Sequence, residues 1–160
     1  MTKEEIQLLL KDLCARLPYG VRGKVKADTV VPHKYDIDGF PVETTFDVDV
    51  ELQRIDVSTD KIFVSTFDNN EDLGDYIEEC QNDIPYIIEE FTPYLRPMSS
   101  MTKEEDKEWQ YYKNAIAESC DERLEERISE LHDWLNAHHF DYRGLIEKGL
   151  ALEAPEGMYN

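Results

Sequence analysis

The sequence lacks the long apolar runs of membrane proteins. No stretch of its 160 residues approaches the roughly 18 consecutive apolar residues that cross a bilayer. Residues 1–10 follow an amphipathic pattern and do not form the apolar segment of a signal peptide. We therefore expect a cytoplasmic protein without a membrane partner.

Cysteine is also scarce. The chain has three cysteines, Cys14, Cys80 and Cys120, and none belongs to a CxxC pair. This spacing argues against a disulfide framework and against a zinc knuckle. We expect small buried or half-buried thiols, with Cys14 buried within an amphipathic helix. No serine stands in a GxSxG context, so the sequence gives no support for nucleophilic catalysis.

Basic residues are few compared with acidic ones. The chain has 17 Lys and Arg against 36 Asp and Glu, and its net charge is −19. Residues 36–91 alone carry 17 of the acids against two bases. A field of this size repels nucleic acid and anionic membranes and attracts cations or basic protein surfaces. We expect a basic protein partner and no direct nucleic-acid binding.

The composition is that of a folded domain. Apolar residues make up 41% of the chain and aromatic residues 11%, too many for a disordered acidic tail. The length fits a single domain, residues 1–160, with a helix at 1–20, mainly strands at 21–95 and mainly helices at 98–160. The predicted fold is α+β: an N-terminal helix, a small antiparallel sheet or SH3-like barrel, and C-terminal helices packed on one side.

Capping boxes predict where helices begin. Thr2 with Glu5 and Thr102 with Glu105 have the spacing in which each side chain bonds the backbone of the other residue. Asp121 is the predicted cap of a third helix.

Alternating apolar and polar residues predict three consecutive antiparallel strands. Asp38-Gly39 predicts a hairpin turn between the first two, and Arg54 breaks the alternation of the second, which predicts a bulge. In the third strand, Phe63 and Phe67 are expected to share a face. The three strands are predicted at residues 21–31, 42–52 and 62–67.

Strings at the two ends and near the centre of the chain are distinctive: 13–21 (LCARLPYGV), 93–101 (PYLRPMSSM) and 140–159, which begins FDYRGLI and ends APEGMY. They resemble uncharacterised proteins encoded by Bacteroides-type gut bacteria and their phages or prophages. The resemblance covers roughly the first 22 and the last 70 residues, and no activity is attached to it. The resemblance implies that the protein occurs in a bacterial or phage-infected bacterial cell. Common ends around a divergent middle would suit a shared scaffold that presents a variable surface.

A row of carboxylates is predicted on the second strand. Asp47, Asp49 and Glu51 share one face at intervals of about 7 Å, similar to the spacing of phosphates along a nucleic-acid strand. The row is interpreted either as an acidic binding face, including mimicry of DNA, or as the solvated side of an amphipathic strand. The first strand carries the basic face of the chain: Arg22, Lys24 and Lys26.

Two groups of residues have features of metal sites. The first group matches four positions of an EF-hand calcium loop, but Leu73 stands where that loop needs glycine. The second group consists of three histidines, two of which are about 10 Å apart along a helix, too far for one ion unless the helix ends between them. The alternative for His138 and His139 is a pair of surface imidazoles at a helix end. The calcium set is Asp68, Asn70, Asp72 and Glu79, and the histidine set is His132, His138 and His139.

The sequence predicts no defined reaction and no cofactor. We interpret the protein as a small non-enzymatic accessory or interaction protein with an acidic binding face. The alternatives are a metal-dependent or hydrolytic enzyme that uses histidines and carboxylates of the C-terminal region, and a DNA-mimic inhibitor of a nucleic-acid-binding protein. A homo-oligomer would be marked by an exposed apolar patch on the third helix.

Overall fold

The computed structural model describes residues 1–35, 41–66 and 85–159, and its mixture of helices with a mostly antiparallel sheet confirms the predicted α+β class. The predicted turn at Asp38-Gly39, the calcium set and Cys80 lie outside the described residues. Within the described part of the chain, no helix is long and apolar enough to cross a membrane.

The helices begin close to the predicted positions. The Thr2 and Thr102 hydroxyls each accept a hydrogen bond of 3.2 Å from the backbone N–H three residues on, so both capping boxes are confirmed. The prediction for the third helix was wrong by one residue, because Cys120 occupies the cap position and Asp121 is the first helical residue. The α-helices are α1 (Lys3–Arg16), α3 (Lys103–Ala117) and α4 (Asp121–Ala137), and the 3₁₀ turns are η1 (Leu17–Tyr19), η2 (Ile88–Glu90) and η3 (Met98–Ser100).

The strands form one row in the order β4-β3-β2-β1-β5-β6. The three consecutive antiparallel strands predicted from alternation are β1, β2 and β3, and the register shift between Leu52 and Arg54 confirms the predicted bulge. The last two strands, β5 and β6, pair in parallel. The strands are β1 (Arg22–Tyr35), β2 (Pro41–Asp56), β3 (Lys61–Thr66), β4 (Tyr86–Ile87), β5 (Thr92–Leu95) and β6 (Leu152–Glu153).

Phe63 lies on the outer face of β3, opposite the buried face. Ile62 and Val64 are buried, whereas Phe63 is only half-buried on the other face. The Arg54 guanidinium lies 3.8 Å from the centre of the Phe63 ring, so a cation–π contact covers this aromatic on the outer side. Phe63 therefore does not belong to the core face, and Phe67 lies outside the described residues.

Apolar side chains gather in three clusters along the molecule. The largest lies between α1 and the sheet, with Leu13, Val50 and Ile62 fully buried. A small second cluster joins Leu95 of β5 to the C-terminal segment. The third lies at the base of α4 around Trp134, and the half-buried residues of α3 pack on it.

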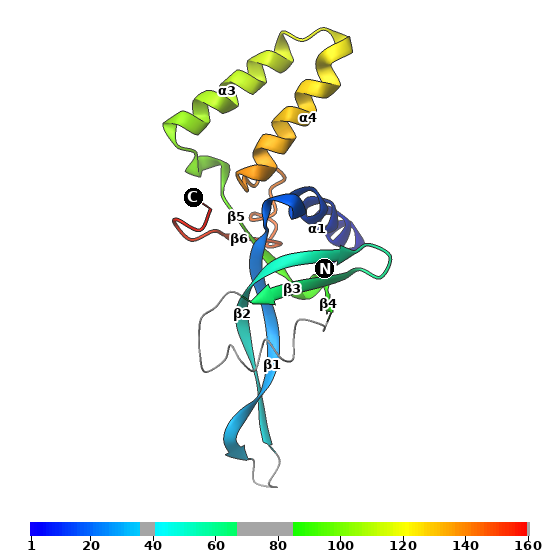
Figure 1. The fold of residues 1–160 in the computed structure, drawn as a ribbon, viewed down its shortest axis with the longest axis vertical. Helices are drawn as coiled ribbons and strands as arrows, with labels where there is room; N and C mark the ends of the chain where they lie inside the picture. Colours follow the sequence, from blue (N-terminus) through cyan, green and yellow to red (C-terminus); the bar gives the residue numbers. More distant parts are fainter. Residues whose placement is uncertain (36–40, 67–84, 160) are drawn as a thin grey trace.

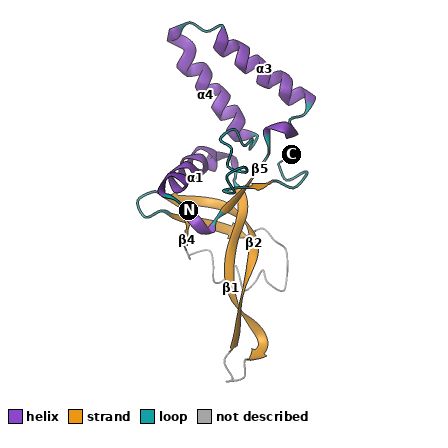
Figure 2. Cartoon of the chain, turned by 180° about the vertical axis from the view of Figure 1, so that it is seen from behind, coloured by secondary structure: helices purple, strands orange, loops and turns teal. Residues whose placement is uncertain are grey.

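Two hairpins extend in opposite directions from the middle of the molecule (Figure 1). The paired helices α3 and α4 leave at one end, and the long strands β1 and β2 leave at the other as a two-stranded ribbon. The view from behind shows α1, β5 and the C-terminal loops between them (Figure 2). We call the α3–α4 hairpin, residues 103–137, the helical arm.

The close approach of β1 and β5 requires glycine at position 23. A Cβ built on Gly23 would lie 2.6 Å from both the Phe91 ring and the backbone oxygen of Thr92. We therefore expect Gly23→Ala to lower the free energy of unfolding by about 1–3 kcal/mol, because a buried ring and a strand must shift. Urea denaturation measures this change. Lys26→Ala, at an exposed position of the same strand, is the control, and equal stability of the two variants would contradict the close packing.

Candidate functional site

The predicted acidic row lies directly opposite the predicted basic face. Antiparallel pairing of β1 with β2 gives each carboxylate a cationic residue as its cross-strand partner, and such partners have Cβ atoms about 5 Å apart. Three positive side chains therefore offset the three negative ones, and this part of the sheet is a face of mixed charge. The pairs are Arg22 with Glu51, Lys24 with Asp49 and Lys26 with Asp47.

Asp49 also connects β2 to β5 through a side-chain hydrogen bond. The Tyr94 hydroxyl donates a hydrogen bond of 2.8 Å to Asp49 Oδ1. Burial, and then this carboxylate, raise the pKa of Tyr94 well above its usual range. Asp49 and Glu51 are half-buried, and only Asp47 of the row is exposed. A phosphate-like ladder needs a run of free carboxylates, and this row does not supply one.

The three histidines do not converge. His132 stacks on Tyr142, and His138 packs on Trp134 with its Nδ1 2.8 Å from the Trp134 carbonyl oxygen. Among the residues that the structure describes, no three His, Cys, Asp or Glu side chains are placed to hold a metal ion. His138 has the predicted helix-end position, whereas His139 is buried and stacks on a tyrosine ring, contrary to the expectation of a surface imidazole.

Cys14 is exposed, so the expectation of a buried thiol there was wrong. It follows Leu13, which is fully buried, and one residue along a helix turns the side chain by about 100° toward solvent. Cys120 is exposed as well.

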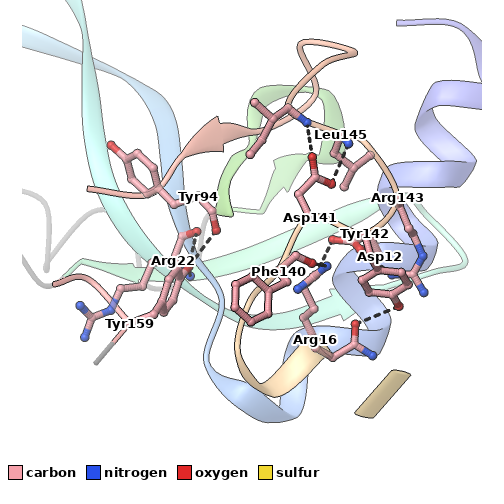
Figure 3. Close-up of polar contacts among 12 residues, drawn as sticks. Asp12, Arg16, Arg22, Tyr94, Phe140, Asp141, Tyr142, Arg143, Leu145 and Tyr159 are labelled. Carbon is pink, nitrogen blue, oxygen red and sulfur yellow. Dashed lines mark hydrogen bonds and ion pairs between the residues drawn. The ribbon is translucent and has the colours of Figure 1, made fainter. Parts of the chain in front are cut away.

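A buried ion network joins α1 to the C-terminal segment (Figure 3). Asp12 and Arg16 are both fully buried, and Arg16 Nε donates a hydrogen bond of 2.7 Å to Asp12 Oδ2. Arg16 Nη2 donates to the backbone oxygen of Phe140, also at 2.7 Å and 124 residues away in sequence. Arg143 pairs with the other carboxylate oxygen of Asp12. We call these four residues the buried junction.

The chain beside the junction is held by backbone bonds and by Asp141. The Arg96 N–H donates to the His139 carbonyl, and the Asp141 N–H donates back to the Arg96 carbonyl, at 2.8 and 2.7 Å. The Asp141 carboxylate then accepts from the N–H groups of Leu145 and Ile146, both at 2.8 Å. These bonds fix the turn after α4 against the end of β5.

Arg96 attaches the helical arm to this centre. Its guanidinium donates two hydrogen bonds to the Glu105 carboxylate, at 2.7 and 2.9 Å, and lies over the Phe140 ring. The Arg96 hydrogen bond is the main cause that lowers the pKa of Glu105 to about 2. Glu105 also closes the capping box of α3. One carboxylate thus begins the helix and anchors it.

Tyr159 brings the end of the described chain back to the sheet. Its hydroxyl donates to the Tyr94 carbonyl at 3.0 Å and accepts from the Arg22 N–H at 3.1 Å (Figure 3). Its ring stacks on His139, with the ring centres 3.7 Å apart. Burial raises the pKa of the Tyr159 hydroxyl to about 12.

Sequence reasoning missed the buried junction. A signal was present, because Asp12 and Arg16 interrupt the apolar stripe of the first helix four residues apart, the spacing of a helical ion pair. The strings 13–21, 93–101 and 140–159 supply Arg16, Arg96 and Phe140. The distinctive sequence therefore coincides with the contacts that hold the elements together.

The helical arm carries both exposed apolar side chains and exposed acidic ones. No residue of α3 is buried, Tyr111 is 63% exposed and Ile128 is 37% exposed. A hollow of about 440 Å³ lies near the turn between the helices. Its lining includes Tyr111, Ser119, Arg123 and Arg127. Four exposed acids, none in an ion pair among the described residues, follow the side of α4 away from its buried residues: Glu122, Glu125, Glu126 and Asp133.

No protein-family model matches the chain, and no curated protein or solved structure matches it either.

We expect Arg16→Met to lower the free energy of unfolding by about 3–5 kcal/mol, since the change leaves the buried Asp12 carboxylate with one cation and removes the bond to Phe140. Urea denaturation gives the value. Lys11→Met, an exposed position of α1, is the matched control. A loss below about 1 kcal/mol in Arg16→Met would contradict the role of the junction.

Acid should weaken the anchor of the arm. Because the folded-state pKa of Glu105 is about 2 and its ordinary value is 4.5, the pair contributes stability above pH 4.5 that is lost as the pH falls toward 2. Glu105→Gln keeps the capping geometry but has no charge to titrate. Between pH 4.5 and 2, we expect the free energy of unfolding to fall less in Glu105→Gln than in the wild type. An equal fall in the two proteins would show that the Arg96–Glu105 pair does not cause the acid sensitivity.

Proposed function

We propose that the protein is a non-enzymatic interaction protein whose helical arm binds a basic surface of a partner protein. The observation that carries the proposal is the attachment of the arm at its base alone, with an aromatic and an aliphatic side chain left exposed farther out. Tyr111 and Ile128 are two of the large apolar side chains that are exposed to solvent in the described part of the chain. An arm with this surface is typical of a docking element.

The packing of the arm supports this function. Trp134, Leu135 and Phe140 are buried at the base, and the Trp134 indole donates a hydrogen bond of 2.8 Å to Glu108. Toward the turn between the helices, the inward-facing Ile116 and Leu124 are only half-buried. Most helical stability in proteins comes from tertiary packing, so a partner that covers this half would stabilise it.

The charge of the arm favours a basic partner over a second copy. Residues 103–137 contain eleven acids and five bases. The acidic side of α4 would repel the same side of another chain and attract cationic side chains. The strand row predicted as the acidic face is offset by the bases opposite it, so we place the binding surface on α4 instead.

The histidine environments give less support to a hydrolytic or metal-dependent enzyme. A general base must lie within hydrogen-bond reach of the proton that it takes from the substrate. His132, His138 and His139 each stack on an aromatic ring, which suits a packing role.

The proposal predicts that neutralising the arm removes binding and that neutralising the strand row does not. The arm variant replaces the three Glu of the α4 acidic side with Gln and Asp133 with Asn. The strand variant is the matched control, with Asp47→Asn, Asp49→Asn and Glu51→Gln. Both are compared with the wild type in a pull-down from bacterial lysate at physiological salt, quantified by mass spectrometry.

We expect a basic protein that the wild type and the strand variant retain equally and that the arm variant retains about tenfold less, because several favourable charge contacts are lost. Tyr111→Ser in the otherwise unchanged arm should weaken retention of the same protein. If only the strand variant fails to retain the partner protein, the binding surface lies on the sheet and not on the arm. Equal retention of the same proteins by all forms would exclude the arm as an acidic docking element.

A further inference from the structure

Residues 155–159 are joined to the rest of the molecule by few contacts. Just before them, the Ala154 N–H donates a hydrogen bond of 2.8 Å to the Leu95 carbonyl and ties the chain to β5. Among the described residues, no backbone hydrogen bond joins 155–159 to another element. The bond of 3.1 Å from the Met158 N–H to the Pro155 carbonyl lies within the stretch itself. We call residues 155–159 the strap.

Apolar packing contributes little to holding the strap. Leu150 and Ala151 belong to the second apolar cluster, whereas no residue of the strap, all of which the structure describes, belongs to any of the three clusters. The strap also borders a surface hollow of about 390 Å³, whose lining includes Ser100 and Thr102 just before α3. Segments with few buried apolar contacts are those that open locally at low cost.

The Tyr159 hydroxyl fastens the strap between two strands (Figure 3). It accepts a hydrogen bond of 3.1 Å from the Arg22 N–H and donates one of 3.0 Å to the Tyr94 carbonyl. The pairing of β1 with β5 stops at Gly23 and Pro93, so Arg22 and Tyr94 are the next pair in the same register. The hydroxyl therefore stands in the place of a direct bond between the strands. Water can make the same two bonds, which lowers the cost of releasing the tyrosine.

The other contacts of the strap are one long hydrogen bond and one stacked ring. Arg22 Nη1 donates to the Met158 carbonyl at 3.4 Å. The Tyr159 ring lies flat on the His139 imidazole, with ring centres 3.7 Å apart and an angle of 13° between the planes. The strap is thus held mainly by Tyr159, and its ring covers His139.

His139 has an unusual conformation for a histidine. Its φ is 56°, in the left-handed region where helices usually end with Gly or Asn. Its side chain is 3% exposed, and its Nδ1 has no hydrogen-bond partner among the described residues. Native proteins pair nearly all buried polar atoms, and strained backbone positions gather at binding sites and switches.

We propose that the strap opens and closes over His139, with Tyr159 as its latch. In the closed state, the ring covers the imidazole and the hydroxyl occupies the Arg22 N–H and the Tyr94 carbonyl. In the open state, one face of the imidazole and both backbone groups meet solvent beside the hollow that Tyr159 lines. The strap therefore controls access to a hydrogen-bond donor, an acceptor and an aromatic face that lie together.

Opening should become easier as the pH falls, because the closed strap helps to keep the imidazole neutral. Burial and then Arg16 lower the pKa of His139 from 6.5 to about 4; Arg96 acts in the same direction and Asp12 opposes it. These charged side chains lie on α1 and at the end of β5, so opening relieves only part of the burial. Between pH 6.5 and 4 the open state binds more protons, and the closed state loses stability as the pH falls through this window.

Amide hydrogen exchange of Arg22 in the full chain measures the opening, because this N–H is bonded to the Tyr159 hydroxyl. We expect it to exchange faster than the amides of α1. His139→Asn suits the left-handed backbone and leaves the Tyr159 hydroxyl in place, but it removes the stacked ring. It should raise the opening constant at Arg22 about fivefold, the equivalent of one lost aromatic contact. His132→Asn, which removes a ring stacked on Tyr142, is the matched control and should not change it.

The same measurement at two pH values tests the coupling to His139. After correction for the intrinsic exchange rate, the opening constant at Arg22 should rise several-fold from pH 7 to pH 5 in the wild type and stay constant in His139→Asn. An equal rise in both proteins would overturn the coupling. If Arg22 in the wild type opens only together with α1, the strap does not move on its own and the proposal fails, and this result needs no variant.

Discussion

The Asp12 carboxylate, shared between Arg16 and Arg143 in the interior, is the interaction on which the arrangement of the other elements depends. Burying an ion is costly, and a buried pair is tolerated only when its geometry and its remaining hydrogen bonds are good. Arg16 adds a bond to the Phe140 carbonyl, so the same group that neutralises Asp12 also positions the turn after α4. The first helix and the C-terminal segment are thereby joined across most of the chain.

Further polar contacts hold the elements near the junction. Arg96 connects β5 to the first turn of α3 through Glu105, and Tyr159 connects the end of the described chain to β1 and β5. The two hairpins extend beyond these contacts in opposite directions (Figure 1). The molecule therefore has a well-connected middle and extended ends, and surfaces that bind partners are commonly found on parts that are less tightly packed.

Features that depend on nearby residues could be predicted from the sequence. The capping boxes of α1 and α3, the alternation of β2 and the bulge at Arg54 each follow from residues a few positions apart. Features that depend on distant residues could not. The acidic and basic rows were both visible, but their alignment is set by the register of β1 on β2, which the pattern of either strand alone does not reveal. Asp12 and Arg16 became a site only through Phe140 and Arg143.

Hydrogen exchange followed residue by residue on the native chain is the most direct test of this account. The account predicts that amides of α1, β5 and the segment 140–151 exchange slowest and together, because they open only when the junction breaks. Amides near the turn between α3 and α4 should exchange faster, through local opening of the arm. If the segment 140–151 exchanges independently of α1, or the arm is as protected as α1, the junction is not what holds the fold together.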